Sequence, residues 1–295
     1  MPARILNGNE IAEEIKTDLK NDLEELRKRK ITPGFGALLI GDDPGSKIYV
    51  NRKEKMCQEL GIEADVRRLP GTVNQKEVVD IIHGFNNNPA IDGILVQLPV
   101  PKHLNSEAIL YELNPDKDVD GLHPVNAGRL ATGTGGFVPC TPGGIIEIFH
   151  RRQIKTDGVH IVIAGRSNIV GKPLLNLLTS KPRGGNSTVT MCHSRTPDIS
   201  VYTKQADIVI AAIGVPEFIK GDMIKPGSVV IDVGMNRVED PASPKGYRLT
   251  GDVHFQSAVE VASAITPVPG GVGPLTIIML MKNIILSAQR RAKIV

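Results

Sequence analysis

The chain has few cysteines and little excess charge of either sign. Cys57, Cys140 and Cys192 are isolated and lack CxxC spacing, so the sequence indicates neither a disulfide framework nor a zinc site. A formal net charge of +3 gives no strong attraction to nucleic acid, although it suits small ligands that carry phosphate. We therefore expect a protein of a reducing compartment with no nucleic-acid partner.

The sequence pattern also predicts neither a targeting segment nor a membrane-spanning segment. The N-terminus has no charged region followed by an apolar segment, so no signal peptide is predicted. No run of about 18 apolar residues lacks charges or breakers, so we expect no membrane span. The sequence contains neither internal repeats nor low-complexity segments. These features predict a cytoplasmic protein.

The histidines show no metal-binding or hydrolase pattern. His123, His160 and His193 lack metal-type spacing, and neither an HExxH motif nor a Ser-His-Asp arrangement is identifiable. We predict no metal.

The sequence does contain two series of alternating strand and helix patterns. Strands are expected at 36–40, 62–69 and 91–98, and then at 159–164, 188–191, 208–212, 228–233 and 264–266. Between them, Ser46 is the predicted N-cap of a helix that ends at Leu60 before Gly61, and 75–85 is a second helix. This order predicts an α/β fold of two domains with parallel sheets.

The two domains are expected to join near Pro139–Gly144. The apolar stretch Leu275–Leu286 predicts a buried helix that returns to the first domain. We assign 1–142 plus 272–295 to an α/β catalytic domain and 143–271 to a Rossmann-type dinucleotide-binding domain.

A nucleotide site is predicted where the run 159–164 ends at Gly165. Glycine lets the backbone approach a ligand closely, and N–H groups at the start of the next helix attract anions. Arg166 suits a phosphate. The spacing is Gly-x5-Gly, not GxGxxG, so an ordinary strand-to-helix turn is the alternative.

The second strand of this domain carries the signal for cofactor choice. Ser194 and Arg195 stand where an acidic residue would bind the ribose of NAD, which favours NADP. A polar loop that happens to contain an arginine is the alternative. Ile213, Gly214 and Gly234 end the next strands, where the ribose or nicotinamide of a cofactor fits, although glycines there are also common in turns.

Four polar residues are candidates for chemistry in the first domain. Tyr49 and Lys53 share a helix face, Gln97 lies near the end of an apolar strand, and Asp120 precedes Gly121. Each has a structural alternative, because a Tyr-Lys pair is often surface packing, a glutamine can bond backbone, and an aspartate can form a turn.

Taken together, the motifs resemble one family, the bifunctional methylenetetrahydrofolate dehydrogenase/cyclohydrolases. The resemblance covers nearly the whole chain, in order. It is carried by Tyr49–Lys53, Asp92–Pro99, Asp116–Gly121, Pro139–Pro142, Gly165–Gly171 and Ile265–Pro274. It implies a homodimer of one-carbon metabolism that oxidises 5,10-methylenetetrahydrofolate with NADP and hydrolyses 5,10-methenyltetrahydrofolate to 10-formyltetrahydrofolate.

The resemblance also implies the roles of individual residues. Lys53 is the catalytic lysine, Gln97 its partner, Tyr49 the ring that packs on the folate, and Asp120 the carboxylate that binds the pterin. Further residues are implied at the folate cleft, Pro269, Gly270, Gly271, Val272 and Gly273, and at the cofactor, Gly165, Arg166 and Ser167. Hydrolysis requires a base near neutral pH, so we expect burial and the cationic substrate to lower the pKa of Lys53.

Two other functions stay open at this point. One is a different NAD(P)-dependent Rossmann dehydrogenase of a small substrate, for example one resembling shikimate dehydrogenase. The other is a catalytically silent nucleotide-binding protein with the same fold.

Overall fold

The computed structural model describes residues 2–181, 184–243 and 246–294. It divides into two compact units. Unit 1 comprises Met1–Glu13 and Thr141–Thr276, and unit 2 comprises Glu14–Cys140 and Ile277–Val295. The predicted α/β fold with parallel sheets is confirmed.

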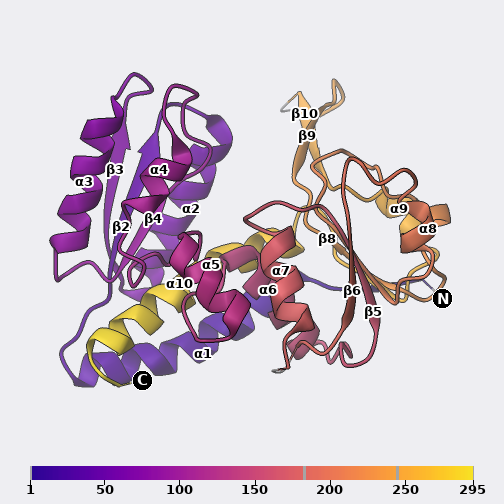
Figure 1. Ribbon diagram of the computed structural model, residues 1–295, viewed down its shortest axis with the longest axis horizontal. Coiled ribbons are helices and arrows are strands. Elements are labelled where there is room, and N and C mark those ends of the chain that lie inside the picture. The colour runs from indigo at the N-terminus through magenta and orange to yellow at the C-terminus, as the bar shows by residue number, and fades with distance from the viewer. Residues whose placement is uncertain (1, 182–183, 244–245, 295) are drawn as a thin grey trace. The chain divides into compact units, whose positions relative to one another are not determined.

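Unit 2 is built on a three-stranded parallel sheet in the order β3-β2-β4. Its strands are β2 (Gly34–Ile40), β3 (Glu63–Leu69) and β4 (Gly93–Val96). β2 lies in the middle and all its residues are buried. The connecting helices α2 (Pro44–Leu60) and α3 (Gln75–Asn87) flank the sheet (Figure 1). The predicted β-α-β-α-β series is therefore present.

Helix α2 begins earlier than its sequence pattern indicated. The N-cap is Asp43, not Ser46, because the Asp43 carboxylate accepts the Ser46 N–H at 2.7 Å and Pro44 occupies the first turn. Gly61 ends the helix as predicted, in the left-handed conformation at φ 71°.

The remaining helices of unit 2 cover this core. They are α4 (Ser106–Tyr111), α5 (Pro124–Thr132), most of α1 (Gly8–Lys28) and most of α10 (Val272–Arg291). Arg291 of α10 forms a bidentate ion pair with the buried Asp92 at 2.6 and 3.1 Å. Ser287 donates to the Asp92 carbonyl at 2.7 Å. These contacts anchor the C-terminal helix in unit 2, which confirms its expected return to the first domain.

Among the described residues, α10 alone is long and apolar enough to cross a membrane. Buried residues make up 67% of its most apolar window, which is the pattern of a core helix.

Unit 1 contains a six-stranded parallel sheet in the order β1-β11-β8-β7-β5-β6. The strands are β1 (Arg4–Ile5), β5 (His160–Ala164), β6 (Thr188–Cys192), β7 (Ile208–Ala211), β8 (Val229–Asp232) and β11 (Ala264–Ile265). The helices are α6 (Cys140–Arg151), α7 (Gly171–Thr179), α8 (Ser200–Thr203) and α9 (Phe255–Ala258), with the 3-10 turn η1 (Gly221–Met223). β5 and β7 are fully buried apart from His160, as expected for inner strands covered on both faces.

Two features of unit 1 escaped the sequence analysis. The two-residue strand β1 pairs with β11, which places the N-terminal residues in unit 1 although the sequence analysis assigned 1–142 to the other domain. An antiparallel hairpin of β9 (Asn236–Glu239) and β10 (Tyr247–Thr250) projects after β8 (Figure 1). β1 and the hairpin strands are short and largely exposed, so no regular spacing of hydrophobic residues marks them in the sequence.

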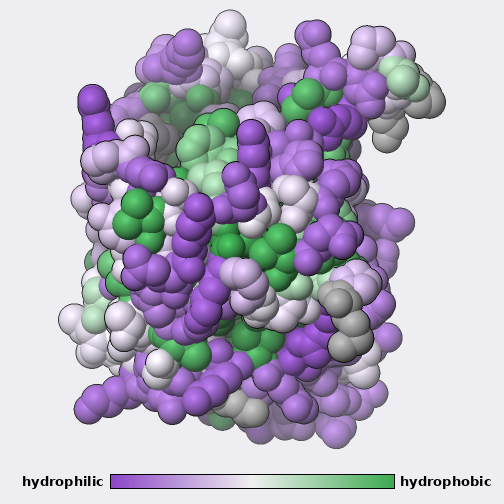
Figure 2. All heavy atoms as spheres, turned by 90° about the vertical axis from the view of Figure 1, so that its right-hand side faces the viewer, coloured by the Kyte–Doolittle hydropathy of each residue, from purple (hydrophilic) through white to green (hydrophobic). Residues whose placement is uncertain are grey.

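Figure 2 shows one face of the molecule, on which hydrophobic side chains are interspersed with hydrophilic ones.

Candidate active site

Lys53 lies on the buried face of α2 and points to the end of β4. It is 7% exposed, and its neighbours on the same helix face, Val50 and Cys57, belong to the core. Its Nζ donates to Gln97 Oε1 at 2.9 Å. Gln97 in turn donates through Nε2 to the Leu98 carbonyl at 2.7 Å, which fixes the amide with its oxygen toward the lysine. The structure thus joins two of the predicted residues in a direct hydrogen bond.

Burial controls the charge of this lysine. It lowers the pKa of Lys53, and the nearby Asp120 carboxylate opposes that change. Burial, and secondarily Asp120, raises the pKa of the Cys140 thiol well above its usual value. The thiol therefore remains neutral beside Asp120 and serves as a hydrogen-bond donor. Gln97 and Asp120 thus both lie close to the Lys53 amine.

Helix α10 holds the loop that carries Asp120 through hydrogen bonds. Asn283 donates from Nδ2 to the carbonyls of Val119 at 2.8 Å and Val138 at 3.0 Å. Cys140 Sγ donates to the same Val119 carbonyl at 3.6 Å. Asn283 is only 5% exposed, so these bonds are shielded from water. Neither Cys140 nor Asn283 was among the predicted site residues.

Tyr49 lies one helical turn before Lys53 on α2 and is half-buried. Burial raises the pKa of its hydroxyl, so the ring is neutral at physiological pH. A neutral aromatic ring beside a buried amine suits a flat heterocyclic ligand.

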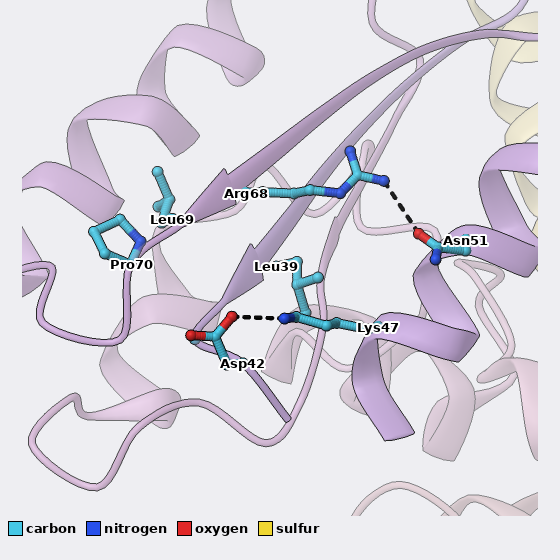
Figure 3. A pocket seen from close by; sticks show the side chains of 8 residues that line it. Leu39, Asp42, Lys47, Asn51, Arg68, Leu69 and Pro70 are labelled. Carbon is cyan, nitrogen blue, oxygen red and sulfur yellow. Dashed lines mark hydrogen bonds and ion pairs between the residues drawn. The ribbon is translucent and has the colours of Figure 1, made fainter. Parts of the chain in front are cut away.

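A nearby surface hollow of about 350 Å³ is a separate feature (Figure 3). Its charged side chains already have partners, because Lys47 pairs with Asp42 at 2.7 Å and Arg68 donates to Asn51 at 3.2 Å. Lys47 and Asn51 lie on a different face of α2 from Lys53, since helix positions rotate by about 100° per residue. This hollow is therefore not part of the Lys53 cluster.

In unit 1, the Gly-x5-Gly stretch forms the predicted strand, turn and helix. Gly165 has φ 133°, and a Cβ at this position would lie 2.1 Å from the Ala212 carbonyl oxygen. A Cβ at Gly171, the first residue of α7, would lie 2.3 Å from the Gly165 oxygen. Only glycine fits at either position, because the helix start packs directly on the strand end.

The residues around this turn suit an anionic ligand. The Ser167 hydroxyl accepts the Val170 N–H at 3.1 Å at the start of α7. The side chains of Arg166 and Arg195 are exposed, and neither has an acidic partner among the residues that the structure describes. Ser194 is exposed next to Arg195 in the turn after β6, which pairs with β5. Two exposed guanidinium groups at one sheet edge fit the phosphates of a dinucleotide.

The turns after β7 and β8 contain the other predicted cofactor residues. Gly214 has φ 76°, and a Cβ at this position would meet no heavy atom within 4 Å, whereas Gly234 is buried. The N–H groups of Ile213 and Gly214 both donate to the Asp252 carboxylate, at 2.5 and 2.8 Å. Sequence reasoning missed Asp252, and no motif marked it, because it follows the unpredicted strand β10.

The glycines of Pro269–Gly273 have a structural role next to the one that the resemblance implies. Gly8 N donates to the Gly270 carbonyl at 2.8 Å, and a Cβ at Gly8 would lie 1.7 Å from the Gly271 oxygen. Gly270 has φ 99°, which favours glycine. Unit 1 therefore needs this sequence to pack the loop before α10 on the start of α1.

Comparison with known proteins covers both units. The family model of the tetrahydrofolate dehydrogenase/cyclohydrolase catalytic domain matches residues 6–120, and the model of the NAD(P)-binding domain of the same enzymes matches residues 139–292. The bifunctional protein FolD of Acetivibrio thermocellus is 50% identical over 293 residues, which cover 99% of each chain.

Two solved structures extend this similarity to the fold. The bifunctional FolD dehydrogenase/cyclohydrolase of Campylobacter jejuni has a TM-score of 0.92 and 41% identity, covering 98% of this chain and 99% of the other. The Trypanosoma brucei enzyme, solved with NADP cofactor and inhibitor, has a TM-score of 0.93 and 36% identity over 99% of both chains. Both family models, a full-length relative and the fold agree, and this chain belongs to the tetrahydrofolate dehydrogenase/cyclohydrolase family.

Proposed function

We propose that this protein oxidises 5,10-methylenetetrahydrofolate to 5,10-methenyltetrahydrofolate with NADP and then hydrolyses the product to 10-formyltetrahydrofolate. The observation that carries the proposal is the buried Lys53 amine bonded to Gln97 Oε1 at 2.9 Å beside Asp120. Similarity over both family models favours this function over another Rossmann dehydrogenase or a silent nucleotide-binding protein.

In the oxidation step, the protein mainly positions the substrate. The carbon that loses hydride is flanked by two nitrogens whose lone pairs stabilise the resulting cation, so no strong base is required. NADP, when bound, accepts the hydride. Tyr49 packs on the folate ring system, and Asp120 binds the pterin through its carboxylate.

The hydrolysis step depends on Lys53. Water adds to a cationic carbon and must lose a proton, which requires a base or relay near neutral pH. A protonated lysine would repel the cation, and burial lowers the pKa of Lys53, which favours the neutral amine. Gln97 orients that amine without adding a charge, because its own Nε2 is fixed to the Leu98 carbonyl.

For NADP, we propose a site on unit 1 at Gly165, Arg166 and Ser167. The close packing of Gly165 and Gly171 sets the turn before α7, and the N–H groups at the start of that helix suit a diphosphate. Ser194 and Arg195 bind the 2′-phosphate, because the exposed guanidinium provides a fork of donors. Ile213, Gly214 and Gly234 contact the nicotinamide half. The NADP complex of the Trypanosoma brucei relative supports this choice of cofactor.

Folate contacts are also proposed at Pro269, Gly270, Gly271, Val272 and Gly273. We propose 1–142 with 272–295 as the catalytic domain and 143–271 as the dinucleotide-binding domain, a functional division in which 1–13 and 272–276 pack within unit 1. We further propose a cytoplasmic homodimer without a resident metal and without nucleic-acid or membrane partners.

A two-signal assay tests the proposed function. Purified protein is mixed with methylenetetrahydrofolate and either NADP or NAD, and methenyl absorbance and its decay are both followed. We expect methenyl to form with NADP and to decay faster than the uncatalysed rate. Accumulation without enzymatic decay would remove the hydrolase activity, and no methenyl with either cofactor would remove the dehydrogenase.

A matched pair of variants assigns the hydrolysis to Lys53. Lys53→Met is expected to lose it, whereas Lys47→Met, on the same helix but 48% exposed and paired with Asp42, is expected to retain it. Full hydrolysis by Lys53→Met would show that the role is misassigned.

A further inference from the structure

Two buried aspartates connect the loops of unit 1 that contain the proposed nicotinamide contacts. Asp232 is the last residue of β8 and is 4% exposed, and Asp252 follows β10 and is fully buried. Both carboxylates accept hydrogen bonds from backbone N–H groups of the surrounding loops.

Asp252 bridges the ends of two neighbouring strands. Its Oδ2 accepts from Ile213 N at 2.5 Å and Gly214 N at 2.8 Å, directly after β7. Its Oδ1 accepts from Asn236 Nδ2 at 2.8 Å, beyond the end of β8. One carboxylate therefore fixes both turns in which the sequence places cofactor contacts.

Asp232 holds Asp252 in place. Its Oδ1 accepts from Gly234 N and from Asp252 N, both at 2.9 Å, and its Oδ2 accepts from Val253 N at 2.9 Å. Its own N–H donates to Thr266 Oγ1 at 2.7 Å. The aspartate pair thus links the ends of β7, β8 and β11.

The backbone around the pair leaves no room for side chains. A Cβ at Gly251 would lie 1.8 Å from Asp232 Oδ2, and one at Gly234 would lie 2.3 Å from Asp252 Oδ1. Two carboxylates are thus enclosed close together, where burying charge is unfavourable for stability. Burial raises the pKa of Asp232 to about 7, which is consistent with that cost. This buried carboxylate pair costs folding stability, and it lies at the carboxyl ends of parallel strands, where ligands bind. Such a placement indicates a function.

We propose that Asp252, held by Asp232, is a positioning residue for the dehydrogenase: it keeps the Ile213–Gly214 turn and Gly234 in the shape that receives the nicotinamide half of NADP. This inference rests on the proposed function. It assigns Asp252 no contact with substrate, and it predicts an effect on the NADP-dependent step but not on the hydrolysis of methenyltetrahydrofolate, whose proposed residues Lys53 and Gln97 lie in unit 2.

The test compares Asp252→Ala, Asp252→Asn and the control Asp207→Asn. Asp207 lies just before β7, at the end of that strand opposite the turn that Asp252 contacts. There it accepts from His160 N and pairs with Lys225. For each protein, KM for NADP is measured in the dehydrogenase assay, hydrolysis of methenyltetrahydrofolate is measured without cofactor, and the melting temperature is recorded.

We expect Asp252→Ala to raise KM for NADP at least tenfold and to change the hydrolysis rate less than twofold. Asp252→Asn keeps one acceptor for the two N–H groups, so we expect a rise of about threefold, corresponding to the difference between charged and neutral acceptors. Asp207→Asn should leave KM for NADP unchanged.

Two results would overturn the inference. One is a KM for NADP in Asp252→Ala within twofold of the unsubstituted protein, and the other is a parallel loss of both activities, which indicates a merely structural role. If Asp252→Ala does not fold, Asp252→Asn decides alone, with an unchanged KM refuting the inference. Failure of the unsubstituted protein to reduce NADP would instead refute the proposed function.

Discussion

Replacing Gln97 by glutamate tests whether hydrolysis depends on a neutral Lys53. The substitution preserves the shape of the side chain but places a carboxylate where Oε1 now lies, 2.9 Å from the lysine Nζ. At that separation and an effective dielectric constant of about 20, Coulomb's law gives an attraction of about 6 kcal/mol. Desolvation of the new carboxylate offsets part of this energy, but the net electrostatic effect still favours the ammonium form of Lys53.

A lysine kept as ammonium cannot act as a base and repels the cationic substrate. General acid–base catalysis contributes about 10²–10⁴-fold to a rate, so Gln97→Glu is expected to lower hydrolysis at pH 7 at least about 100-fold. The assay follows the decay of methenyl absorbance, corrected for the uncatalysed rate. The dehydrogenase is assayed separately, because its chemistry requires no base.

Gln97→Met is the matched control for this charge effect. It has nearly the same length but removes the hydrogen bond without adding charge, so a loss of about tenfold is expected from one missing bond. Raising the pH should partly restore Gln97→Glu by deprotonating the lysine, but should leave Gln97→Met unchanged. The reasoning is refuted if the two variants lose equal activity and respond equally to pH.

Four further predictions follow from other contacts. Lys53→Met should keep or raise the melting temperature at pH 7, because burial penalises the charged amine, whose folded pKa is lowered; the unsubstituted protein should gain relative to it as the pH rises toward 10. Arg195→Ala should raise KM for NADP about tenfold to 100-fold, as expected for a lost charge-assisted bond, while KM for NAD changes little; equal changes would contradict the assignment. Arg291→Ala should lower the free energy of unfolding measured in urea by about 3–5 kcal/mol, since it leaves the 1% exposed Asp92 side chain without its bidentate partner. Asp232 has a folded pKa raised from 3.8 to about 7, so its stabilising contribution is full below about pH 4 and is lost as the pH rises through 7; urea titrations should show that an Asp232→Ala variant lacks this decline.

The sequence alone determined the alternation of strands and helices, and it supplied the individual site residues that we propose. Apolar periodicity is a local property, so inner strands such as β5 and β7 could be predicted from their own residues. Asp43 shows the limit of such reasoning, because the sequence pattern predicted Ser46 as the N-cap and only the backbone geometry placed the cap at Asp43.

Tertiary structure decided which polar residues meet and in which protonation state. Lys53 and Gln97 are 44 positions apart, and neither their hydrogen bond nor the lowered pKa of the lysine can be read from spacing, since both depend on packing. Asp252 illustrates the same point, because its partners Ile213 and Gly214 lie 38 and 39 positions earlier and no motif marks them. Local pattern fixes secondary structure, whereas burial and contact between distant segments create the chemistry of the site.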